Sequence, residues 1–148
     1  MDKVEGEYIW ITDIDTIEED PDEVMRQVDF TLNLSVWCDG QIAGENHYAH
    51  FPIPDGSGSY LDFKQAVDTA LERVLNDEEV LIHCAAGVSR SVAVATTVVA
   101  CRRETGFEDE LGRVRSSRNS GLDPSPALRR YGKRYVEEHL ESGGDVSE

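Results

Sequence analysis

The sequence predicts an α/β fold in which a central, mostly parallel sheet of about four to five strands is flanked by helices. Short β-rich runs alternate with helical segments along the chain, which is the order expected for such a sheet. The run at 80–84 is almost wholly apolar, as expected for a strand buried on both faces of a parallel sheet. The segment at 91–103 is apolar on almost every side, which predicts a buried central helix.

The first half of the chain predicts short strands separated by turns. The expected elements are a strand at 8–12, a short helix at about 21–28, a strand at 31–36 and an extended segment at 48–53. An acidic break follows the first strand, and polar, turn-like residues occupy 37–44. Gly and Ser dominate residues 55–59, so we expect a loop there.

The second half predicts longer helices. Apolar side chains keep helical spacing from 60 to 75 and charged residues fill the opposite face, which predicts an amphipathic surface helix. Two further helices are expected at about 108–115 and 126–140. Ser125 is the expected N-cap of the last helix, with Pro126 in its first turn.

The chain has the length of one domain, with 148 residues. We therefore assign residues 1–141 to a single domain and residues 142–148 to a frayed acidic tail. The sequence contains no internal repeat. Its apolar content lies just under the globular norm, so disorder of the whole chain is not expected.

The charge is strongly unbalanced. There are 30 Asp and Glu against 14 Lys and Arg, which gives a net charge of −16 and an isoelectric point of about 4.5. Such a chain disfavours generic binding to nucleic acids or anionic membranes, because both are negatively charged. Only Lys3, Lys64 and Lys133 are lysines. The bias predicts a halophilic protein, since molar salt screens repulsion among carboxylates, and the alternative is an ordinary acidic protein.

The cysteines and the apolar runs indicate where the protein works. Cys38, Cys84 and Cys101 form no CxxC pair, so neither a disulfide framework nor a zinc site is indicated. The N-terminus is acidic and lacks an apolar leader, and the longest uncharged apolar stretch, 92–101, is far shorter than a membrane span. We expect a soluble protein of the reducing cytoplasm.

One motif at the end of the buried strand carries chemistry. It reads His83-Cys84-Ala85-Ala86-Gly87-Val88-Ser89-Arg90-Ser91. Backbone N–H groups of such a loop point into one concavity at a helix N-terminus, where the peptide dipoles also favour an anion. Gly87 can adopt the positive φ that the curl needs, and Arg90 offers a planar fork for two phosphate oxygens. The same field favours the thiolate of Cys84, so a nucleophile is expected at the floor of a phosphate cradle.

On this motif the chain resembles the dual-specificity phosphatases, a family of cysteine-dependent protein tyrosine phosphatases with the signature HCxxGxSRS. The resemblance covers about residues 30–140, including 51–55, 114–118 and 126–131, while the N-terminal strand fits less well. It implies a protein-tyrosine-phosphatase-like fold and one catalytic domain over 1–141. It also implies metal-independent hydrolysis of phosphomonoesters through a cysteinyl-phosphate, with phosphorylated Ser, Thr or Tyr of proteins as the expected substrate.

The resemblance assigns a role to each residue of the motif. Cys84 would attack phosphorus in line, and Arg90 would bind the equatorial oxygens through the transition state. Ser91 would donate a hydrogen bond to the departing sulfur, and His83 would hold the loop from behind. The cradle would consist of Ala85, Ala86, Gly87, Val88, Ser89 and Arg90. No metal ion or other cofactor is expected.

The leaving oxygen needs a proton, which the family takes from an aspartate on a loop about thirty residues before the cysteine. Asp55 lies at this position, after the apolar Ile53 and Pro54, and the glycines beside it would let the loop close. Asp62 is the competing candidate. Its spacing places Asp62 on the polar face of the predicted helix, where it cannot easily reach the cradle.

Other functions stay open at this point. A phospho-binding pseudophosphatase would have lost turnover, which the intact Cys84, Arg90 and Ser91 argue against. A sulfur- or arsenate-handling enzyme would want a different loop ending or a well-placed second cysteine. Within the phosphatase interpretation, the substrate is a phosphoprotein, a phosphoinositide, a nucleotide, an RNA 5′ end or another small phosphomonoester. We expect a monomer.

A few remaining residues suggest weaker hypotheses. His47 and His50 would point to opposite sides of an extended segment, which argues against a metal pair. Cys101 is expected in the core, and a redox role for Cys38 stays open.

Three arginines of the second half allow two hypotheses. Arg113, Arg115 and Arg118 would either form a basic rim that recruits a phosphorylated substrate or neutralise nearby carboxylates, which is the commoner use.

Overall fold

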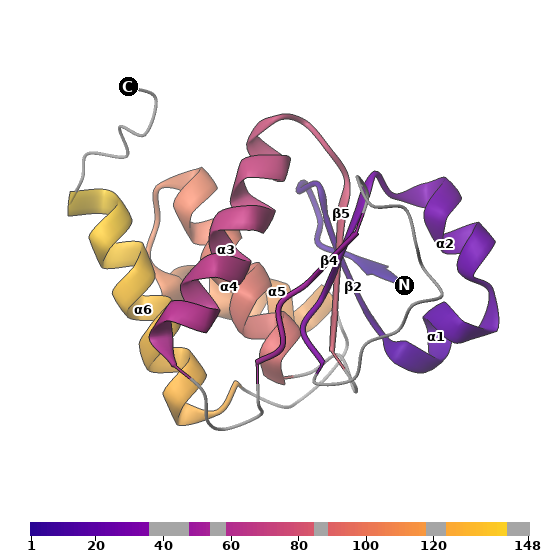
Figure 1. Ribbon diagram of the computed structural model, residues 1–148. Coiled ribbons are helices and arrows are strands. Elements are labelled where there is room, and N and C mark those ends of the chain that lie inside the picture. Colours follow the sequence, from indigo (N-terminus) through magenta and orange to yellow (C-terminus); the bar gives the residue numbers. More distant parts are fainter. Residues whose placement is uncertain (36–47, 54–58, 85–88, 118–123, 142–148) are drawn as a thin grey trace.

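The computed structural model describes residues 1–35, 48–53, 59–84, 89–117 and 124–141. The strands are β1 (Asp2–Lys3), β2 (Ile9–Asp13), β3 (Phe30–Asn33), β4 (Tyr48–His50) and β5 (Val80–Cys84). The helices are α1 (Ile14–Glu19), α2 (Pro21–Gln27), α3 (Tyr60–Leu75), α4 (Ser89–Arg103), α5 (Phe107–Ser117) and α6 (Pro126–Glu141). Figure 1 shows α1 and α2 on one side of the sheet and α3 to α6 on the other. In the described ranges, no helix combines the length and apolar character of a membrane span.

In the described residues the sheet has five strands, in the order β1-β2-β5-β3-β4. Among these strands only β1 is antiparallel to its neighbour, so the predicted mostly parallel sheet is confirmed. β5 lies in the middle, where His83 is in register with Thr12 of β2 and Asn33 of β3. Because parallel strands end at the same edge, Cys84 emerges where ligands of α/β proteins commonly bind.

The alternation of side chains along β5 explains why this strand is apolar. Val80 and Ile82 pack into the main core with α3 and α4, whereas Leu81 packs with Ile17 and Val24 beneath α1 and α2. Successive strand residues point to opposite faces, so helices on both sides require apolar residues throughout. The fully buried strand is therefore confirmed at the predicted bounds, as is the helix α3.

α4 is the central helix of the larger layer. Its residues from 90 to 101 are all buried, and it contacts α3, α5 and α6. At Gly132 of α6, an added methyl group would overlap the Phe107 ring and lie 2.8 Å from Thr97 Oγ1. The glycine thus allows α6 to approach α4 and α5 closely. Ser125 caps α6 as predicted, with Leu128 N donating to its Oγ at 3.4 Å.

Several predictions about the first half of the chain are wrong in detail. The acidic break contains α1, because Asp13 caps this helix by accepting from Thr16 N at 2.8 Å. β3 starts at Phe30 and ends at Asn33, whose side chain accepts from Ser35 N at 2.9 Å and turns the chain out of the strand. The short β1, which pairs with β2, was not expected.

Two helices differ slightly from their predicted bounds, and three predicted segments fall wholly or mostly outside the described residues. α4 begins two residues earlier than predicted, at Ser89, and α5 extends to Ser117. The expected turn at 37–44, most of the loop at 55–59 and the acidic tail at 142–148 lie outside the described residues.

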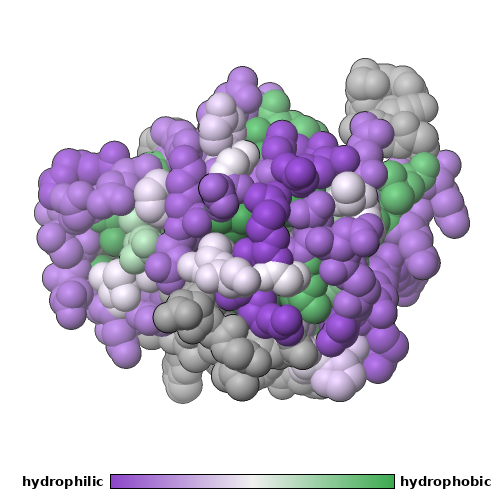
Figure 2. Space-filling view, turned by 180° about the vertical axis from the view of Figure 1, so that it is seen from behind, coloured by the Kyte–Doolittle hydropathy of each residue, from purple (hydrophilic) through white to green (hydrophobic). Residues whose placement is uncertain are grey.

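A buried carboxylate ties the N-terminal hairpin to the helical layer. Glu7 is buried and pairs with Arg102 at 2.5 Å, Arg113 at 3.2 Å and Arg103 at 3.4 Å. Arg113 also pairs with Glu110, at 3.3 Å. Arg113 therefore neutralises carboxylates rather than forming a free basic rim. Hydrophilic residues cover most of the rear face, with small separate apolar patches (Figure 2).

Candidate active site

The motif occupies the junction between β5 and α4. Cys84 is the last residue of β5 and is 1% exposed. α4 starts at Ser89 and carries Arg90 and Ser91 in its first turn. Ala85, Ala86, Gly87 and Val88 lie outside the described residues, so their predicted part in the cradle stays a prediction. The two described ends agree with the predicted passage from a buried strand into a buried helix.

Arg90 is held from one side. Its side chain is 9% exposed, and Nη1 donates to the backbone oxygen of Ile53 at 3.2 Å. Nε is buried and has no hydrogen-bond partner among the described residues. A buried charged donor without an acceptor is unfavourable by itself, so this position suits an anionic ligand.

The segment that holds Arg90 is itself fixed to the sheet. Phe51 N donates to Asn33 O at 2.9 Å, and Ile53 N donates to Leu34 O at 3.0 Å. These bonds extend the pairing of β3 and β4 to the edge of the site. Asp55 follows two residues after Ile53 and lies outside the described residues, so its role as general acid stays a prediction.

His83 and Ser91 are both fully buried. His83 precedes Cys84 on β5, and its backbone oxygen accepts from Leu34 N at 2.8 Å. The Ser91 hydroxyl makes no hydrogen bond to a group in the described part of the protein. The bond from Ser91 to the sulfur that the resemblance implies is thus not formed in this arrangement.

Comparison with known proteins agrees with this geometry. No protein-family model matches the chain. The chain is 34% identical over 94 residues to dual specificity protein phosphatase 22 of Xenopus tropicalis, covering 60% of this chain and 45% of the relative. It therefore spans less than half the length of that curated relative.

Solved structures share the fold. A mutant form of Tk-PTP gives a TM-score of 0.70 at 25% identity, over 84% of this chain and 87% of that one. Human DUSP28 gives 0.77 at 18% identity, over 94% of each chain. The motif lies between β5 and α4 of the fold that this chain shares with these structures. In sequence and in fold, the chain is similar to the dual-specificity phosphatases.

The competing candidate for the acid, Asp62, lies in the first turn of α3. Its backbone N–H donates to Ser59 Oγ at 3.2 Å, and its side chain lines a hollow of about 280 Å³ with Phe51, Pro52 and Gln65. The hollow thus borders the segment that holds Arg90. Asp62 therefore shares a hollow with residues next to Ile53, and the preference for Asp55 as the acid stays a prediction.

One cradle residue has a second role that sequence analysis missed. Ser89 Oγ accepts from Ser125 N at 3.0 Å, which ties the start of α4 to the start of α6. The two residues are 36 positions apart, so no local pattern pointed to this contact.

A polar network at the edge of the central sheet was also missed. Asn33 is fully buried, accepts from Ser35 Oγ at 2.7 Å and donates to Tyr48 OH at 3.0 Å. His50 Nε2 lies 2.6 Å from Ser35 O. An Asn followed by Ser at the end of a predicted strand is the signal that could have indicated this turn.

Some of the remaining histidines and cysteines lie among the described residues. Within the described ranges, no group of His, Cys, Asp and Glu could hold a metal ion. Cys101 is buried in α4, and burial together with the Asp68 carboxylate raises the pKa of its thiol to about 12. The prediction that Cys101 is a core residue is confirmed, whereas Cys38 and His47 lie outside the described residues.

Proposed function

We propose that this chain is a metal-independent, cysteine-based phosphatase that hydrolyses phosphomonoesters on proteins. The observation that carries the proposal is the buried Arg90, which is anchored to Ile53 O while its Nε lacks an acceptor among the described groups. A phosphate oxygen would supply that acceptor, and the planar guanidinium could bind two oxygens at once. The similarity to dual specificity protein phosphatase 22 supports the same conclusion.

The reaction would proceed in two steps. The Cys84 thiolate attacks phosphorus, an S–P bond forms, and the P–O bond to the substrate breaks as Asp55 gives its proton to the leaving oxygen. Water then attacks phosphorus and gives a proton to the Asp55 carboxylate. The S–P bond breaks, inorganic phosphate leaves and the thiolate is restored, with Ser91 stabilising the departing sulfur. Arg90 and the N-terminus of α4 stabilise the phosphate oxygens in both steps.

A hydrolysis screen at high salt tests the proposal and its substrate class. We expect phosphopeptides to give a higher kcat/KM than inositol phosphates, nucleotides or 5′-phosphorylated RNA. A higher value on one of the other compounds would assign the site to that substrate instead. Cys84→Ser keeps the shape of the cradle but lacks a stabilised anion, so it should bind an aryl phosphate without turnover. Retained hydrolysis in that variant would exclude the cysteinyl-phosphate.

We also propose that the protein works in a reducing, salt-rich cytoplasm. The buried thiol of Cys101 and the net charge of −16 support this location.

A further inference from the structure

We propose that the hollow between the segment 51–53 and α3 binds a basic side chain of the substrate, with Asp62 as its ion-pair partner. The basic residue would lie one or two positions from the phosphorylated residue of a peptide. The inference rests on the proposed phosphatase function and names a substrate preference of that site.

The position of the hollow follows from the contact of Arg90. Pro52, which lines the hollow, directly precedes Ile53, whose oxygen accepts from Arg90 Nη1 at 3.2 Å. Adjacent residues have Cα atoms about 3.8 Å apart, and an extended peptide advances about 3.3 Å per residue. A side chain one or two positions from a phosphate bound at Arg90 would therefore span a separation of this size and enter the hollow.

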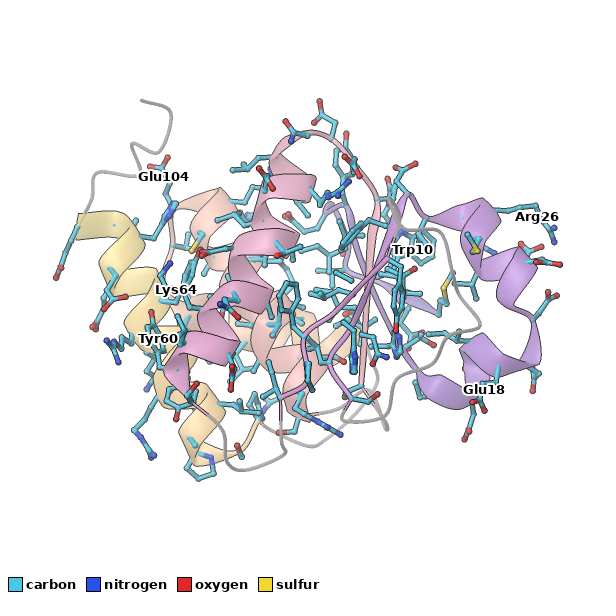
Figure 3. All side chains as sticks on the ribbon, viewed as in Figure 1. Trp10, Glu18, Arg26, Tyr60, Lys64 and Glu104 are labelled. Atoms are coloured by element: carbon cyan, nitrogen blue, oxygen red, sulfur yellow. The ribbon has the colours of Figure 1, made fainter. Side chains whose placement is uncertain are left out.

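The lining of the hollow suits a long basic side chain. Phe51 and Pro52 offer apolar surface for an aliphatic stem, and Gln65 offers an amide oxygen. Asp62 offers a carboxylate, and none of the described cations pairs with it. The neighbouring Lys64 pairs instead with Asp68, at 2.9 Å. Tyr60 and Lys64, labelled in Figure 3, mark the first turns of α3 on either side of Asp62.

The charge of the whole chain strengthens the preference. A phosphopeptide that approaches a protein of net charge −16 is repelled at long range. A basic residue beside the phosphate offsets this repulsion and gains a local partner in Asp62. An acidic residue at the same position is repelled by the net charge at long range and by the Asp62 carboxylate at short range.

Paired phosphopeptides test the inference. Two peptides that differ only in Arg or Glu beside the phosphorylated residue are compared by kcat/KM, at the lowest salt at which melts show every variant folded. We expect the wild type to prefer the Arg peptide, and Asp62→Asn to reduce the Arg-to-Glu ratio about fivefold, the size of one partly exposed ion pair. Glu72→Gln is the matched control, since it removes the same charge from an exposed position of α3 about 15 Å further along.

Two readouts separate this inference from the proposed function. Hydrolysis of an aryl phosphate reports on the phosphatase itself, and its absence in the wild type would reject the proposed function. Binding of both peptides to Cys84→Ser, with and without Asp62→Asn, reports on the subsite without turnover. Equal kcat/KM and equal binding for the two peptides would overturn the subsite. A ratio that falls as much in Glu72→Gln as in Asp62→Asn would assign the preference to net charge alone and overturn the role of Asp62.

Discussion

Arg90 Nη1 donates to the backbone oxygen of Ile53 at 3.2 Å, across 37 positions of the sequence. This contact joins the helix that starts the phosphate cradle to the segment that leads toward Asp55. If Arg90 binds the phosphate and Asp55 donates the proton, as proposed, the two roles are coupled through one short stretch of backbone.

Replacement of Arg90 tests the cradle directly. Arg90→Lys should lower kcat/KM on an aryl phosphate at least about a hundredfold, because a point charge cannot reproduce the two parallel donors. Arg130→Lys, an exposed position of α6, is the matched control and should keep the wild-type rate. A near-normal rate in Arg90→Lys would remove Arg90 from the transition state.

The general acid is identified by its dependence on the leaving group. Asp55→Asn should lose far more rate on an alkyl phosphate than on an activated aryl phosphate, whose leaving group departs without a proton. The ratio of the two rates is the measurement. Asp62→Asn should leave this ratio unchanged, and the opposite pattern in the two variants would make Asp62 the acid.

The contact at Gly132 predicts a loss of stability. Gly132→Ala should lower the free energy of unfolding by about 1–3 kcal/mol, because the new methyl group overlaps the Phe107 ring. Gly112→Ala on α5 is the control, since an added Cβ there meets nothing within 4 Å. That change should stabilise by about 0.4–1 kcal/mol through the unfolded chain. Thermal melts of both variants test this prediction. Equal melting temperatures for Gly132→Ala and Gly112→Ala would contradict the close packing of α6.

The buried Glu7 predicts a dependence of stability on pH. Burial raises the pKa of Glu7, but hydrogen bonds and charges from Arg102 and Arg113 outweigh it, so the pKa lies below its ordinary value of 4.5. A lowered pKa in the folded state contributes stability above the unfolded pKa, and this contribution is lost as the pH falls through the folded value. Glu7→Gln should therefore destabilise by about 2 kcal/mol at pH 7, the size of a hydrogen bond to a charged group.

Melting temperatures from pH 7 down to about 3 check this prediction, around the ordinary carboxyl pKa. The difference between the wild type and Glu7→Gln should shrink as the pH falls. Glu23→Gln, which breaks an exposed pair with Arg26, should change the melting temperature little at any pH. A difference for Glu7→Gln that stays constant with pH would show that its carboxylate is not the stabilising form.

The surplus negative charge predicts a dependence on salt. Self-repulsion among the carboxylates opposes folding in dilute buffer, and the Debye length falls from about 10 Å at 0.1 M salt to about 3 Å at 1 M. The melting temperature and the hydrolysis rate should therefore rise with sodium or potassium chloride from about 0.1 to 3 M, the range over which that length shortens. A melting temperature that is flat or falls would reject the salt-adapted interpretation and leave an ordinary acidic protein.

Local patterns in the sequence were sufficient to predict the central strand and the helix beside it, and to suggest the chemistry of the motif. The bounds of β5 and α3 were predicted correctly. Burial on both faces gives β5 an uninterrupted apolar run, and burial on one face gives α3 a helical period of apolar residues, and both signals are local. The spacing from Cys84 to Arg90 similarly belongs to a single loop, so the proposed nucleophile and the proposed phosphate-binding arginine could be named without a fold.

Tertiary structure alone decided how these parts are held. The bonds from Arg90 to Ile53, from Ser125 to Ser89 and from Arg102 to Glu7 join residues 37, 36 and 95 positions apart. Each depends on the order of the strands and on the approach of separate helices, which no local period encodes. The placement of the hollow beside Asp62 depends on the same packing, because its walls come from two segments that meet only in the folded chain.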